Sequence, residues 1–283
     1  MFGARLNHET RFFVASGRKG IGLIPDAIHH RELSGIESID LSHQASSSTA
    51  YPLGTRKGIT TSTGPVQQSL TLSRYLIYND PILGLTGDIA PSGINGSIHY
   101  ADRSYGFKSG HLTNYSVNCA VGTIPKVSAN FQIFGEMKSG YSASGTLTHP
   151  DIYIPSQGSI SLTCDNGYQD VSTTNRIVGF DYSVQSKRKP LFSIGRKNPA
   201  DVVFIPPLQY NASVQVEVDD AMLQSGFNFL TGRKNRTLLF TINGRDGNLL
   251  HNFSVPKASL VAEQLNASAD GSLKLTLNYI GHS

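Results

Sequence analysis

The chain is 283 residues long, 39% apolar and 16% charged, with a formal net charge of only +4. This length allows two domains of about 100–150 residues, each large enough to bury its own core. The sequence lacks the run of ~18 apolar residues that a membrane helix needs, and its first residues lack the apolar centre of a secretion signal. Cys119 and Cys164 are too few for a disulfide framework and lie in apolar, strand-like runs, which indicates reduced, buried thiols made in a cytoplasm.

The N-terminal segment, residues 1–34, is predicted to form an arm or edge strands. Its glycine-rich stretch at residues 17–22 lacks the Lys-Ser/Thr of a phosphate-binding loop and therefore indicates a turn. His29 and His30 are adjacent, so on a strand they would point apart, whereas a zinc site needs converging ligands. We expect neither a metal nor a cofactor.

Most of the remaining regular structure is predicted to be β. Polar and apolar residues alternate with a period of two, which is typical of antiparallel strands with one buried face and one wet face. The alternating runs are residues 69–73, 127–133, 159–164, 214–218 and 273–279. A further short strand is predicted at residues 152–154.

One short helix is predicted in each half of the chain. Asp219 and Asp220 precede an apolar stretch that reaches residue 230, and acidic residues are typical caps at a helix start. In residues 75–85, Asp80 can cap a helix that has Pro81 at its first position. The adjacent acids are explained more simply as a cap than as the acid pair of a glycosidase, and the chain has no Gly-X-Ser-X-Gly elbow. We therefore expect a protein without enzymatic activity.

Four blocks of sequence recur in the same order in the two halves. Residues 36–54 share Ile, Asp, Ser, Gln and Gly with residues 177–195, and residues 85–87, 114–117 and 133–135 resemble residues 230–232, 252–255 and 279–281. The prediction is a mainly β chain with two tandem β-sandwich domains, residues 35–140 and 141–283, each with one short α-helix and a long hairpin. A duplicated domain commonly fills equivalent positions around the axis of an assembly.

The predicted hairpins, residues 45–64 and 186–206, are long and polar. Such hairpins reach neighbouring subunits more often than they enclose a catalytic pocket. Basic residues gather there without interleaved aromatic residues or a recognition helix, which favours solvent or acidic subunit surfaces over specific nucleic-acid binding. The candidate inter-subunit contact residues are Lys187, Arg188, Lys189, Arg196, Lys197, Arg56 and Lys57.

Taken together, these features resemble the tail tube proteins of long-tailed bacteriophages. The segments that carry the resemblance are residues 35–41 with 122–131, and residues 176–195 with 200–218. In that family the subunits form stacked rings whose inner strands close into a β-barrel around a channel for DNA. Members with two tandem domains form trimeric rings with pseudo-sixfold symmetry.

The resemblance implies a structural protein of the virion, assembled in the host cytoplasm, with no membrane partner. Its expected partners are further copies of itself, the tape measure, terminator and distal tail proteins, and genomic DNA that passes non-specifically through the lumen. Because luminal cations would retain phosphate, we expect Lys187, Arg188 and Lys189 to lie outside the lumen. Two alternatives stay open: another tail component (distal tail, terminator or secretion-tube-like protein), and a virion β-sandwich that binds a carbohydrate or receptor.

Overall fold

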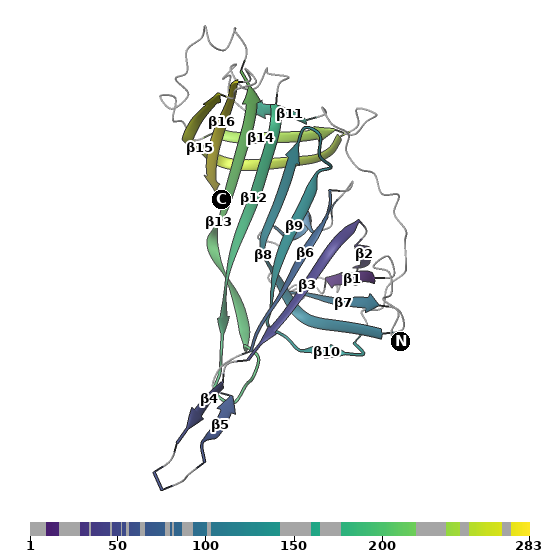
Figure 1. Ribbon diagram of the computed structural model, residues 1–283, viewed down its shortest axis with the longest axis vertical. Coiled ribbons are helices and arrows are strands. Elements are labelled where there is room, and N and C mark those ends of the chain that lie inside the picture. The colour runs from purple at the N-terminus through teal and green to yellow at the C-terminus, as the bar shows by residue number, and fades with distance from the viewer. Residues whose placement is uncertain are drawn as a thin grey trace, which may run out of the picture.

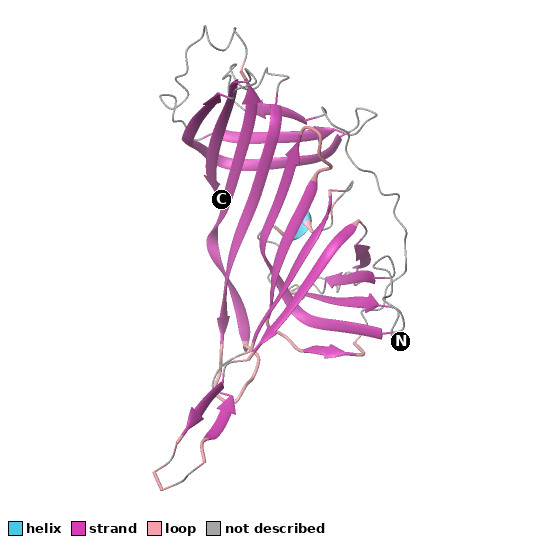
Figure 2. Cartoon of the chain, viewed as in Figure 1, coloured by secondary structure: helices cyan, strands magenta, loops and turns pink. Residues whose placement is uncertain are grey.

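The computed structural model describes residues 10–16, 29–33, 35–45, 47–51, 53–54, 57–62, 66–76, 80, 82–86, 93–100, 103–141, 160–164, 177–218, 236–243, 249–267 and 273–283. Within these ranges the chain is almost entirely strand (Figure 2). The mainly β fold class predicted from the period-two pattern is therefore confirmed.

One large antiparallel sheet contains 14 strands, and β4 and β5 form a separate two-stranded hairpin (Figure 1). The strands of the first half are β1 (Thr10–Ser16), β2 (His29–Leu33), β3 (Ile36–Gln44), β4 (Ser47–Ala50), β5 (Ile59–Ser62), β6 (Gln67–Tyr75), β7 (Ile94–Tyr100), β8 (Arg103–Ala120), β9 (Lys126–Ile133) and β10 (Met137–Ser139). Those of the second half are β11 (Ile160–Cys164), β12 (Ile177–Leu191), β13 (Asp201–Glu217), β14 (Arg236–Asn243), β15 (Leu249–Ala267) and β16 (Leu273–His282).

Within the described residues, each run of alternating polar and apolar residues lies on a strand, except that residue 218 follows the end of β13. In β6, for example, Leu70 and Leu72 are fully buried while Ser69 and Thr71 are exposed. The same alternation appears along β9 and along the middle of β16. The short strand predicted at residues 152–154 and the glycine-rich residues 17–22 lie outside the described ranges.

The two halves arrange their strands in the same spatial order. In the first half, neighbouring strands follow the order β7-β8-β9-β6-β3, and in the second half they follow β14-β15-β16-β13-β12. At the far end of each group, another antiparallel strand pairs with the first member: β1 with β7, and β11 with β14. β2 continues beyond β1 as the edge of the sheet.

The longest strand of each group changes direction at a comparable point. Ser109 in β8 has a φ of 54° and Lys257 in β15 has a φ of 47°, which few residues other than glycine adopt. A glycine packs against each bend. Gly135 contacts the carbonyl oxygen of Lys108, which precedes Ser109, and Gly281 contacts that of Pro256, which precedes Lys257. A Cβ at either glycine would collide with this carbonyl, so both bends depend on the missing side chain.

These bends let the strand ends fold back over the apolar face of the long strands. In the second half, Phe180 of β12 lies 4.5 Å from Phe240 of β14, measured between ring centroids, and Tyr182 lies 5.0 Å from Phe253 of β15. Figure 1 shows β14 and β15 crossing the direction of β12 and β13. In the first half, Phe107 of β8 belongs to the same buried cluster as Leu70. The core therefore lies between the long strands and the strands that cross them.

Helix is nearly absent from the described residues. Of the segment at residues 75–85, predicted to be a short α-helix, Tyr75 ends β6 and only Leu83–Leu85 form a turn of 3-10 helix. Asp80 accepts a hydrogen bond from the N–H of Ile82 at 2.9 Å, as expected of a cap, but the same carboxylate also faces a buried arginine. The α-helix prediction is therefore wrong for the described part of this segment. The predicted helix at residues 219–230 lies outside the described residues.

Candidate assembly surfaces

The long strands carry a polar face with few charged residues opposite the core. Rows of cross-strand partners lie on it, because directly opposite residues in antiparallel strands point to the same side. One row runs from β6 to β13 through Ser73, Ser128, Ser116, Ser183 and Asn211. Serine, threonine, asparagine and glutamine dominate this face, so it is hydrophilic with few fixed charges.

This polar face is hollowed near the centre of the sheet. A depression of about 350 Å³ lies over β8, β12, β13 and β16. Its polar lining includes Asn118, Asp181, Ser183, Ser213 and Asn278. Such a depression, spread over four neighbouring strands, makes the polar face concave at this point.

A continuous antiparallel pairing joins the two halves. Residues 114–120 of β8 pair with residues 179–185 of β12, from Asn114 opposite Gln185 to Ala120 opposite Gly179. We call this pairing the internal seam. On its polar side the amide of Asn118 donates a hydrogen bond to the carboxylate of Asp181. On its apolar side Val117 and Tyr182 are at most 4% exposed, so the seam is sealed on the core side.

Two other strand edges have the same place in their groups but pair with no further strand among the described residues. In the part of the chain that the structure describes, β3 pairs only with β6, and residues 260–267 of β15 pair only with β16. We call these the free edges. Leu265, on the core side of β15, is 46% exposed, whereas Val117 in the equivalent part of β8 is 1% exposed. No composition signal marks these residues in the sequence; only the repeat, together with the pairing within each half, finds them.

Two hairpins extend beyond the sheet at the end opposite β11 and β14 (Figure 1). The first is β4–β5, and the second is the outer part of β12 and β13, where Leu191 faces Asp201. Both were predicted as hairpins from their sequences. They carry large exposed apolar side chains, namely Tyr51, Leu53 and Ile59 on the first, and Leu191, Phe192, Ile194, Val203 and Ile205 on the second. Exposed apolar residues grouped on projecting hairpins are typical of contact sites.

Most of the predicted basic contact residues lie on the second hairpin. Lys187 and Lys189 are exposed on β12, and Arg196 and Lys197 are exposed at its tip. Arg188 points to the other side, where its guanidinium lies 5.0 Å from the ring centroid of Phe204. Lys57 lies on the first hairpin, away from this group, and Arg56 lies outside the described residues.

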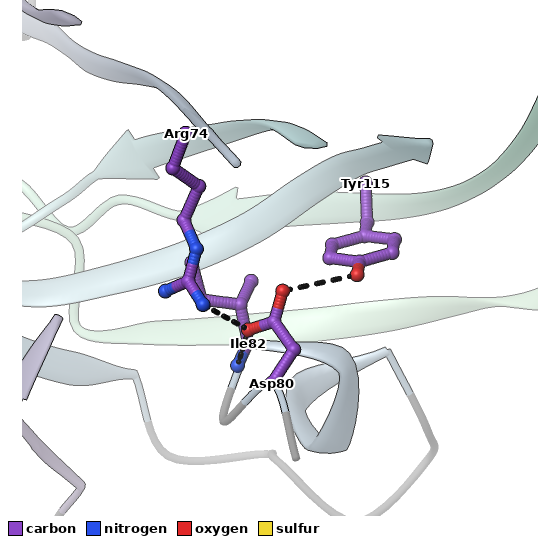
Figure 3. Close-up of polar contacts among 4 residues, drawn as sticks. All are labelled: Arg74, Asp80, Ile82 and Tyr115. Atoms are coloured by element: carbon purple, nitrogen blue, oxygen red, sulfur yellow. Dashed lines mark hydrogen bonds and ion pairs between the residues drawn. The ribbon is translucent and has the colours of Figure 1, made fainter. Parts of the chain in front are cut away.

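A buried ion pair occupies the core of the first half (Figure 3). Arg74 of β6 and Asp80 have fully buried side chains, and their Nη2 and Oδ1 atoms are 3.3 Å apart. The hydroxyl of Tyr115 donates to the other carboxylate oxygen at 3.1 Å. Burial and the neighbouring Asp80 raise the pKa of Tyr115 well above its usual value, so it stays a donor. In the second half, Val216 lies opposite Ile177, the position that Arg74 has opposite Ile36 in the first half.

His111 of β8 is another buried titratable group, and it lines a small cavity together with Arg188 of the second hairpin. It is 4% exposed, its Nε2 lies 3.3 Å from the hydroxyl of Ser109, and its Nδ1 has no hydrogen-bond partner among the described residues. Burial, with a smaller contribution from Arg188, lowers the pKa of His111 to about 4.

Stability at acid pH is expected to depend on His111. Between pH 6.5 and about 4 the unfolded chain binds a proton that the folded chain does not, so the free energy of unfolding falls as the pH falls. At about 1.4 kcal/mol per unit, this loss reaches about 3 kcal/mol. His111→Gln keeps an amide near Ser109 and should remove this part of the pH dependence. Urea unfolding of both proteins at pH 7 and pH 4.5 measures the difference; identical pH dependence would contradict it.

The described residues offer little for chemistry. They contain no group of three or more His, Cys, Asp or Glu side chains placed to hold a metal ion. Cys119 is a buried free thiol, and burial raises its pKa to about 11, so it is a poor nucleophile. None of the described helical segments has the length and apolar character required to cross a bilayer. The surfaces that stand out are therefore the free edges, the polar face and the projecting hairpins.

No protein-family model and no curated protein sequence matches this chain.

Proposed function

We propose that the chain is two tandem copies of one β-sandwich domain that supply alternate positions in a ring. The repeated strand order β7-β8-β9-β6-β3 and β14-β15-β16-β13-β12 supports the duplication. The bends at Ser109 and Lys257, each with a glycine packed against it, support it independently, since neither feature is required of a strand in general.

The observation that carries the ring is the internal seam together with the two free edges. Within the chain, β12 of the second copy lies against β8 of the first. If the same pairing is repeated between chains, β3 of one chain lies against β15 of the next. Such a head-to-tail contact generates a closed ring when its rotation closes and a filament when it does not. Closure satisfies the unpaired backbone groups of both edges, as a barrel does within one chain.

Such a ring suits a conduit for a polyanion. The crossing strands occupy the apolar side of the long strands, so the concave polar face is the one left to line a channel. Few charges on this face mean few ionic contacts with phosphate, and each ionic contact would add affinity and slow passage. The exposed basic residues of the second hairpin lie on the outer part of β12 and at its tip, and this hairpin projects at the end opposite β11 and β14 (Figure 1).

These arguments favour a tail tube protein of a long-tailed bacteriophage, whose stacked rings form the channel for genome delivery. The projecting hairpins, with exposed apolar tips, would contact the next ring in the stack. Further copies of the chain are then its main partners, followed by the tail proteins at either end of the tube and by DNA in the lumen. The proposed location is the virion.

Negative-stain microscopy of the purified chain tests this function. We expect hollow rings or filaments, and single rings with a mass three times that of the 30.6 kDa chain. A terminator-like protein would stop at one ring, whereas a tube protein also stacks lengthwise. A chain that stays monomeric at all concentrations, with or without truncation of the second hairpin tip, would rule the proposal out.

A further inference from the structure

The geometry points to a specific register for the contact between successive chains: residues 39–44 of β3 against residues 262–267 of β15 in the next chain. We call this the closing seam. The inference rests on the proposed ring and specifies the residues that close it. Its basis is that both free edges have a counterpart in the internal seam whose register is known.

Equivalent residues follow from the sequence repeat and from shared partners inside each half. The sequence repeat of residues 36–54 in residues 177–195 makes Ile39 equivalent to Phe180. Since Ile39 faces Leu72 of β6 and Phe180 faces Val214 of β13, Leu72 corresponds to Val214. For the other edge, Leu72 faces Ala129 of β9 and Val214 faces Leu277 of β16, so the next residues, Asn130 and Asn278, also correspond. Asn114 faces Asn130, and Ala262 faces Asn278. By its pairing, Asn114 therefore corresponds to Ala262 and not to Asn252 of the matching sequence block, which pairs with β14, and the residues after Asn114 correspond in order.

The transferred register matches polar residues with polar residues on the channel side. The internal pair Asp181 and Asn118 becomes Asp40 opposite Asn266, the same two residue types in the same positions. The neighbouring pair Ser183 and Ser116 becomes Ser42 opposite Gln264. All four residues are exposed in the single chain, as a free edge requires.

The core side of the closing seam is matched as well. Tyr182 opposite Val117 becomes Leu41 opposite Leu265, and Phe180 opposite Cys119 becomes Ile39 opposite Ala267. Each pair joins apolar residues, and Leu265 would lose its exposure. A register shifted by one residue would bring Leu265 opposite a polar residue of β3, because successive residues point to opposite faces.

One pair differs in kind from its counterpart. Val184 opposite Tyr115 is a buried apolar contact in the internal seam, whereas its equivalent is His43 opposite Glu263. An imidazole can donate a hydrogen bond to a carboxylate, and the two attract when the histidine is charged. Directly opposite residues are within reach of each other, so this pair favours one partner and one register over others.

Cysteine cross-linking tests the register. In a background of Cys119→Ala and Cys164→Ala that assembles like the native chain, Asp40→Cys with Asn266→Cys should form disulfides between chains, since opposite Cα atoms lie about 4.5–5.5 Å apart. A non-reducing gel should then show a ladder that ends at the copy number of the ring. Asn118→Cys with Asp181→Cys is the matched control and should link within one chain. Asp40→Cys with Ala262→Cys, about 13 Å off register on the same face, should not link.

The possible results separate the register from the ring. Rings that are visible while Asp40→Cys and Asn266→Cys stay unlinked, although the internal control links, would overturn the closing seam and leave the ring intact. The absence of rings in the native protein would overturn the proposed function itself.

Exchange of the charged pair gives a second readout. His43→Glu places two carboxylates opposite each other and should raise the concentration needed for rings at least tenfold. Adding Glu263→His restores one acid and one imidazole and should bring this concentration back toward the native value. If His43→Glu assembles like the native chain, or if the exchange does not rescue it, His43 and Glu263 are not opposite each other.

Discussion

Asp80→Asn is expected to lower the free energy of unfolding by about 3–5 kcal/mol, the cost of leaving a buried charge without its partner. The asparagine still fits between the N–H of Ile82 and the hydroxyl of Tyr115, so packing changes little. What it removes is the negative charge that faces Arg74, whose side chain is fully buried. Chemical denaturation of the native and variant chains measures the loss.

The double variant Arg74→Met with Asp80→Asn separates charge from packing. Because the second half fills the place of Arg74 with Val216, an apolar residue is compatible with this position of the sheet. Replacement of a buried ion pair by apolar groups is often neutral, so we expect the double variant to regain most of the stability lost in Asp80→Asn. A double variant as unstable as the single one would mean that the carboxylate matters through its hydrogen bonds rather than through the ion pair.

Period-two alternation predicted the strands well because it reports which face of a strand is buried. Residues 69–73 and 127–133 lie on β6 and β9 as predicted. The helix prediction at Asp80 failed for a physical reason. A capping aspartate and an aspartate that neutralises a buried arginine look alike in sequence, and here the carboxylate faces the arginine while it accepts the N–H of Ile82, the residue that caps the 3-10 turn. Its partner Arg74 is one residue from Ser73 on the polar face, and only the pleat places it in the core.

The assembly surfaces could be predicted only in part. The hairpins and their basic residues are visible in the sequence as polar segments between apolar strands. The free edges are not visible in the sequence, because whether a strand lies at an edge depends on its pairing. Leu41 and Leu265 alternate with polar residues in the same way as apolar residues that are buried within the chain. Arg188 is a further example, since its neighbours Lys187 and Lys189 are exposed while its own guanidinium lies over Phe204.

Leu265→Asp is expected to abolish ring formation while the single chain still folds. Leu265 is 46% exposed in the single chain, so aspartate costs little there. In the closing seam the same position would face Leu41, where burial of a leucine contributes about 1.5–3 kcal/mol and a buried carboxylate adds a further cost. A total of about 4 kcal/mol per contact corresponds to a roughly thousandfold higher concentration for association. Light scattering or mass photometry follows the rings, and circular dichroism follows the fold.

Leu249→Asp is the matched control for this result. Leu249 lies on the same strand, is 49% exposed, and stands opposite Asn243 of β14 rather than on the free edge. If general loss of surface hydrophobicity prevented assembly, both variants would fail; if the closing seam is what holds the ring, only Leu265→Asp fails. Rings formed by Leu265→Asp at native concentrations would mean that β15 does not meet another chain along residues 260–267. The two free edges would then need separate partners, and the internal seam would no longer be a guide to how the chains join.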